Sequence, residues 1–137
     1  MIMATKETTV DASIEKGEVL TAFVESMLEP YEPSPKAAIQ VDVAIDEVFS
    51  NIVQYSGAKS VTVVANLDEP TSMFSLTFVD RGKPYNPLEN KDPDVSLPAE
   101  EREIGGLGIF LVKKTMDDVR YERKGDQNYF TIFKKIR

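Results

Sequence analysis

Apolar and polar residues follow one another along this chain with two different periods, which predict both helices and strands. Apolar side chains recur every three or four positions over residues 13–29 and 35–55, the spacing of an amphipathic helix. A third, shorter apolar helix is predicted over residues 109–116. The other apolar segments are bounded by turn residues and predict strands over residues 5–12, 61–67, 73–80, 117–122 and 128–136.

Helices and strands mixed in this order predict the α+β class. We expect a two-layer α/β sandwich with a mixed, mainly antiparallel sheet and the helices on one of its faces. The chain has 137 residues, the usual size of one domain, and it contains no internal repeat or interdomain linker. A single domain over residues 1–137 is therefore expected.

The helix predicted over residues 35–55 carries a narrow polar strip beside its apolar stripe. At about 100° per residue, Glu47, Asn51 and Gln54 fall together at the edge of the face that should pack on the sheet. Polar side chains in such a position can line a pocket. The same spacing is also typical of an ordinary solvated helix face, so the strip alone does not distinguish a pocket lining from a solvated face.

A polar residue also ends one of the predicted strands, directly before a long loop. Asp80 follows the apolar run of residues 74–79, and residues 81–104 contain four prolines and many charges. A compact domain seldom keeps so long a loop without a purpose, and such loops are often lids. Taken alone, Asp80-Arg81-Gly82 is equally typical of a turn after a strand.

Small residues lead into the third predicted helix. Gly105, Gly106, Leu107 and Gly108 place free backbone N–H groups at a helix N-terminus, which favours a phosphate group there. The segment is neither the Rossmann fingerprint nor the Walker A sequence, and an ordinary glycine-rich loop is the alternative.

Charge and missing residue types narrow the chemistry further. With 16 Lys and Arg against 23 Asp and Glu, the net charge of −7 disfavours binding to nucleic acid or to an anionic membrane. The chain has no Cys and no His, which excludes thiolate and imidazole chemistry and a phospho-accepting histidine. No segment has the apolar length of a signal peptide or a membrane span, so we expect a cytoplasmic protein.

The order of these motifs resembles the GHKL superfamily of ATP-binding domains, which share the Bergerat fold. Within it, the chain is most similar to the stand-alone anti-sigma-factor serine/threonine kinases. The residues that carry the resemblance are 44–55 (AIDEVFSNIVQY), 80–87 (DRGKPYNP) and 105–112 (GGLGIFLV), followed by Met116 and Asp117.

The resemblance implies ATP and Mg²⁺ as ligands, with a role for each motif. Asn51 would give its amide oxygen to Mg²⁺, Asp80 would accept a hydrogen bond from the adenine amino group, and Gly82 would let the backbone approach the base. Residues 81–104 would form the ATP lid. The residues implied to bind phosphate through backbone N–H groups are Gly105, Gly106, Leu107 and Gly108, and those that could add positive charge from the lid are Lys83, Lys91 and Arg102.

The resemblance also implies a reaction and partners. Glu47 would be the catalytic base that deprotonates a substrate serine as the γ-phosphoryl group is transferred. The substrate would be an anti-anti-sigma protein of the STAS type, the ATP-bound form would hold a sigma factor inactive, and the kinase would be a homodimer.

The chain departs from the family pattern at two places, each of two residues. Gln54 and Tyr55 stand where members often carry a His after the Asn of the helix, and Asn128 and Tyr129 stand where they often carry a Gly-Thr pair near the last strand. The second departure leaves open whether the last strand contacts the adenine.

Other functions fit the same residues. The chain is alternatively a nucleotide-gated module that recognises a protein without transferring phosphate, or one module of a larger signalling system. A globular α+β domain that binds no nucleotide is the remaining alternative.

Overall fold

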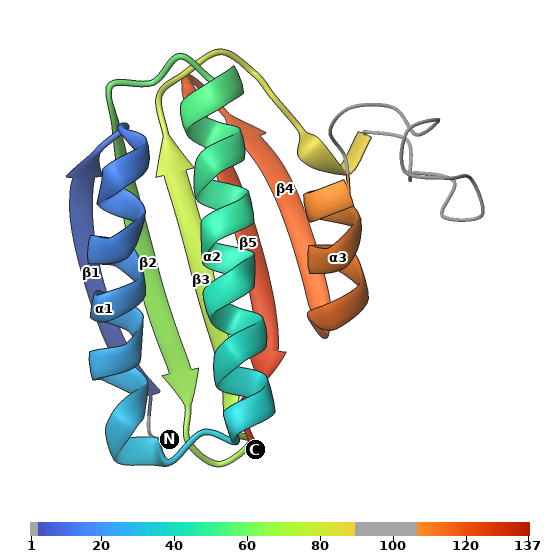
Figure 1. Ribbon diagram of the computed structural model, residues 1–137. Coiled ribbons are helices and arrows are strands. Elements are labelled where there is room, and N and C mark those ends of the chain that lie inside the picture. Colours follow the sequence, from blue (N-terminus) through green and yellow to red (C-terminus); the bar gives the residue numbers. More distant parts are fainter. Residues whose placement is uncertain (1–2, 90–106) are drawn as a thin grey trace.

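In the computed structural model, which describes residues 3–89 and 107–137, three helices cover one face of a five-stranded sheet (Figure 1). The strands lie in the order β1-β2-β3-β5-β4. Their bounds are Met3–Asp11 (β1), Ser60–Asp68 (β2), Met73–Asp80 (β3), Asp118–Lys124 (β4) and Gln127–Lys135 (β5). The expected α+β, two-layer class is confirmed.

The sheet differs from the expectation in one respect, because every described strand pair is antiparallel and none is parallel. The reason lies in the two long helices, α1 (Gly17–Leu28) and α2 (Pro35–Tyr55), which run in opposite directions (Figure 1). They return the chain to the end of the sheet where β1 stopped, so β2 runs back alongside β1. Short turns then join β2 to β3 and β4 to β5.

Local signals set the ends of α2, which matches its predicted bounds. The Ser34 hydroxyl accepts a hydrogen bond from the Ala37 N–H (3.2 Å), and Pro35 occupies the first turn, where its missing N–H costs nothing. Gly57, with φ of +73°, follows the helix end. By contrast, Ser13 makes no side-chain cap, and a 3₁₀ turn over Ile14–Lys16 comes before α1.

The core lies between the helices and the sheet. Inward positions of β2 and β3 are buried at every second residue, and the side chains of Leu20, Ile45 and Phe49 from α1 and α2 fill the space above them. No helix of the described residues is both long and apolar enough to cross a membrane.

The strand order gathers several polar residues at one end of the sheet. β3 lies next to β5, and their register places Asp80 directly opposite Asn128. The C-terminal half of α2 ends over this region, and the segment after β3 runs from there towards the start of α3 (Leu107–Thr115) (Figure 1).

Candidate functional site

One small cavity brings together residues from α2, β3, β4, β5 and the segment after β3. Two of the predicted site residues, Asn51 and Asp80, contribute to it, although 29 positions separate them in sequence. Among the described residues, the lining consists of Val48, Asn51, Ile52, Ser56, Asp80, Tyr85, Pro87, Tyr121, Asn128 and Phe130.

Asp80 presents a buried carboxylate to this cavity, with only 4% of its surface exposed. Its Oδ1 atom accepts two hydrogen bonds, from the Gly82 N–H (2.8 Å) and from the Asn128 amide Nδ2 (3.0 Å). No described residue donates a hydrogen bond to Oδ2. One oxygen of a buried carboxylate is thus available to a donor group on a ligand.

Asn51 is held in an orientation that suits a metal ligand. Its Nδ2 donates to the backbone carbonyl of Glu47, one turn earlier in α2, at 2.7 Å. The amide oxygen Oδ1 therefore turns the other way and accepts only a long hydrogen bond, 3.4 Å, from the Tyr85 hydroxyl. Neutral amide oxygens of this kind are suitable ligands for a hard cation such as Mg²⁺.

Glu47 is a residue of α2, and its side chain reaches the first turn of α3. Its carboxylate is in contact with the backbone of Gly108, and a Cβ atom at that position would overlap Glu47 Oε2 and Cδ. This contact explains why a glycine occurs within α3, which begins two residues earlier than predicted, so that Gly108 lies inside the helix and not ahead of it.

Gly82 is required by its contact with the end of α2. A Cβ atom there would overlap the backbone carbonyl of Ser56, which also accepts a hydrogen bond from the Lys83 N–H at 2.8 Å. Gly82 is thus needed to pack the segment after β3 on α2, and its predicted approach to the base stays a prediction.

Tyr85, which the sequence did not single out, also lines the cavity. The Tyr85 ring meets Tyr55 edge-on, with the ring centroids 5.1 Å apart, and the cavity measures only about 10 Å³. This is the space that one water molecule needs. In this arrangement the cavity is therefore too small to hold a nucleobase.

The remaining predicted residues lie elsewhere. Gln54 and Lys83 are exposed and do not line the cavity. Leu107 is the first residue of α3. Four of the predicted positions fall outside the described residues, namely Lys91, Arg102, Gly105 and Gly106. No three acidic side chains of the described ranges gather as a metal site, so a cation here would depend on ligands besides protein carboxylates.

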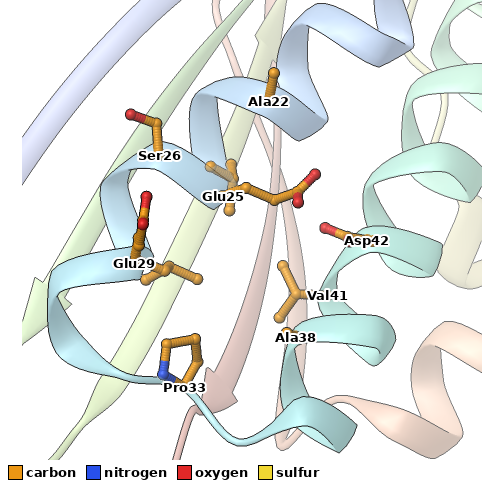
Figure 2. Close-up of a pocket in the computed structure, with 10 residues that line it drawn as sticks. Ala22, Glu25, Ser26, Glu29, Pro33, Ala38, Val41 and Asp42 are labelled. Atoms are coloured by element: carbon orange, nitrogen blue, oxygen red, sulfur yellow. The ribbon is translucent and has the colours of Figure 1, made fainter.

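A larger cavity, of about 520 Å³, lies apart from this site between α1 and α2 (Figure 2). None of the predicted site residues lines it. Glu25 of α1 and Asp42 of α2 extend towards each other across it, as Figure 2 shows. Burial, and to a smaller degree the Glu25 carboxylate, raises the pKa of Asp42 above its ordinary value.

Comparison with known proteins adds a family and several relatives. The model of the histidine kinase-like ATPase domain family matches residues 10–134. The serine/threonine-protein kinase BtrW of Bordetella bronchiseptica is 23% identical over 101 residues, which cover 72% of this chain and 71% of that protein.

Two solved structures share the fold. The RsbU and RsbW domains of Rv1364c from Mycobacterium tuberculosis align with 97% of this chain at a TM-score of 0.68 and 15% identity. A histidine kinase domain from the Erythrobacter litoralis EL346 blue-light activated histidine kinase aligns with 74% of it at a TM-score of 0.53 and 15% identity. This chain spans only 32% and 45% of those two chains, so they share a domain with it and not a whole architecture.

Proposed function

Because the chain belongs to the histidine kinase-like ATPase domain family, we propose that it binds ATP with Mg²⁺ and phosphorylates a serine or threonine of a protein partner. The name of the relative BtrW, a serine/threonine-protein kinase, supports this choice of reaction.

The observation that carries the proposal is the pairing of Asn51 and Asp80 in one cavity. Each has a side-chain oxygen that accepts at most one long hydrogen bond from the described residues. A buried carboxylate oxygen fits the amino group of adenine, and an amide oxygen fits a hard cation. The donor set therefore fits Mg²⁺ and ATP.

Glu47 is the proposed base of the transfer step. Its carboxylate takes the proton of the substrate hydroxyl, while that oxygen forms a bond to the γ-phosphorus and the bond from the γ-phosphorus to the bridging oxygen breaks, leaving ADP. Asn51 would help to hold Mg²⁺, which when bound would offset the negative charge of the phosphates. Asn51 is one helical turn after Glu47, which places both on the same face of α2.

The glycine-rich start of α3 supplies the proposed phosphate contacts. Gly105, Gly106, Leu107 and Gly108 would donate backbone N–H groups at the positive end of the helix. Residues 81–104, which include Tyr85 and Lys83, would form the lid over the nucleotide.

The proposed partners follow from the resemblance to anti-sigma kinases and from the fold shared with an RsbW domain. The substrate is an anti-anti-sigma protein of the STAS type, and the ATP-bound protein, as a cytoplasmic homodimer, sequesters a sigma factor. Binding to nucleic acid or to a membrane is not part of this proposal, in keeping with the net charge of −7.

Thermal unfolding with and without ATP, ADP and Mg²⁺ tests nucleotide binding. A ligand at 100 times its dissociation constant adds about 2.7 kcal/mol and raises the midpoint by several degrees. We expect a Mg²⁺-dependent rise that Asn51→Ala abolishes. Ser50→Ala is the matched control, because it removes a hydrogen bond to the same Glu47 carbonyl and leaves Asn51 intact.

Transfer of labelled phosphate to STAS-domain proteins then tests the reaction. ATP binding without transfer to any of them would favour the nucleotide-gated binding module, and the absence of any nucleotide-dependent shift would overturn the whole proposal.

A further inference from the structure

The Asn128 side chain is at the centre of a buried hydrogen-bond network beside the candidate site. Only 3% of the residue is exposed. Its Nδ2 donates to Asp80 Oδ1 (3.0 Å) and to the backbone carbonyl of Lys83 (2.9 Å). Its Oδ1 accepts from the Tyr121 hydroxyl and from the Tyr85 N–H (3.4 Å). Both N–H groups and both lone pairs of the amide are used, so Asn128 has no group left to contact a ligand directly.

These partners allow only one orientation of the amide. A carboxylate oxygen and a carbonyl oxygen face Nδ2, whereas a hydroxyl and a backbone N–H face Oδ1. Turning the amide over would place acceptors against acceptors in a buried setting, which is costly. Asn128 is therefore a fixed element of the site.

This fixed amide determines which oxygen of Asp80 remains for a ligand. Asn128 and the Gly82 N–H together occupy Oδ1, and Oδ2 is the oxygen without a donor from the described residues. Without Asn128, the carboxylate would lose the contact from β5 that holds its plane.

The same amide also holds the first residues after Gly82. It binds the backbone of Lys83 and of Tyr85, and the Tyr85 hydroxyl in turn reaches Asn51. One side chain thus joins the Asp80 carboxylate to Tyr85, another residue of the cavity lining.

We propose that Asn128 is a positioning residue that presents Asp80 Oδ2 to the adenine and couples base binding to the placement of residues 83–85. The inference rests on the proposed nucleotide function. It also gives Asn128 of β5 a role: this residue acts on the base through Asp80, and its amide makes no contact with the base of its own.

Binding of ADP without Mg²⁺ tests the first half of the inference, because the base contact then dominates. Asn128→Ala is expected to weaken ADP binding about 10-fold or more, the usual effect of losing a hydrogen bond to a charged group. Thr131→Ala is the matched control. It removes a hydrogen bond to Thr77 (2.9 Å) from the same strand, but on the opposite face of the sheet. The ADP affinity of this variant should stay within about 2-fold of that of the original protein.

Asn128→Asp supplies a readout that a merely structural role would not change. A carboxylate there meets Asp80 Oδ1 and the Lys83 carbonyl, and two carboxylates this close need a shared proton. The ADP affinity of this variant, relative to the original protein at each pH, should therefore fall as the pH rises from about 5.5 to 8. A relative affinity that is the same at every pH would overturn the positioning role.

Amide hydrogen exchange in residues 82–89 tests the coupling. In the original protein, ADP should slow this exchange, and Asn128→Ala should remove most of the effect. Wild-type ADP affinity in Asn128→Ala, or an unchanged exchange response, would overturn the inference while the proposed function stands. Failure of the unaltered protein to bind any adenine nucleotide would instead overturn the proposed function.

Discussion

The carboxylate of Glu47 in α2 occupies the space that a side chain at Gly108 in α3 would need. The proposed base and the proposed phosphate-binding helix are therefore fitted to each other through a glycine. A substitution at either residue should therefore alter the packing of the other.

Gly108→Ala is expected to destabilise the protein by about 1–3 kcal/mol, because its Cβ would displace Glu47 or α3. In a Glu47→Ala background the overlap is gone, and the same change should become neutral or stabilise by about 0.5–1 kcal/mol through better helix propensity. Urea unfolding of the four proteins of this double-mutant cycle measures the coupling. Equal costs in both backgrounds would contradict the contact.

Glu47→Gln tests the base directly. The amide keeps the shape of the side chain but cannot accept a proton, so we expect ATP binding to persist and phosphotransfer to fall by about 10² or more. Binding is measured by calorimetry and transfer by single-turnover assays with a phosphorylatable partner. Normal transfer by this variant would mean that another group is the base.

Tyr85→Phe should strengthen the binding of Mg²⁺–ATP. The Tyr85 hydroxyl bonds to the Asn51 oxygen at 3.4 Å, so it competes with the cation for that atom. Losing one weak hydrogen bond should raise the affinity about 2-fold to 5-fold, while ADP without Mg²⁺ is little affected. Tyr129→Phe is the matched control, since its hydroxyl donates to Gln127 away from the site. Weaker Mg²⁺–ATP binding in Tyr85→Phe would show that the hydroxyl assists the cation instead.

Asp42→Asn should stabilise the protein at neutral pH. Burial and the Glu25 carboxylate raise the pKa of Asp42 in the folded state, so its ionised form opposes folding. This cost is absent below the unfolded pKa of about 3.8, grows as the pH rises through the folded pKa, and is complete above it. Because Asp42 and Glu25 face solvent, the increase in the free energy of unfolding at pH 7 should be less than about 1 kcal/mol.

Denaturant unfolding of Asp42→Asn at pH 7 and at pH 3.5 measures this effect, with Asp46→Asn as the control of equal charge one turn further along α2. The advantage of Asp42→Asn should vanish at the lower pH. A constant advantage at both values would trace the effect to something other than ionisation.

The sequence predicted those parts of the fold that depend on neighbouring residues. The ends of α2 were correct because Ser34, Pro35 and Gly57 act within one turn of the helix. The resemblance assigned both Asn51 and Asp80 to a nucleotide site, and the structure places both in the lining of one cavity. That each holds a nucleotide or cation stays a prediction.

The parts that the sequence did not predict depend on residues far apart in the chain. Asn128 meets Asp80 only through the register of β3 and β5, so it looked like a mere departure from a family pattern. Tyr85 lines the cavity and contacts Tyr55 of α2, thirty positions away, and no local spacing indicated this. The position of Gly108 inside α3 likewise depends on Glu47, from another helix.

The pairing of β3 with β5 also determines when the Asn128 contact to Asp80 can form as the chain is synthesised. As the ribosome releases the chain from its N-terminus, Asn51 and Asp80 emerge first, and Asn128 follows 48 residues after Asp80. The Gly82 N–H can bond to the carboxylate early, but the Asn128 bond forms only after β5 has docked. That docking is a contact between distant parts of the chain and is slow to form compared with a helix. A nascent chain that has already folded α1 and α2 would therefore still lack the β5 contact on which the proposed recognition of adenine depends.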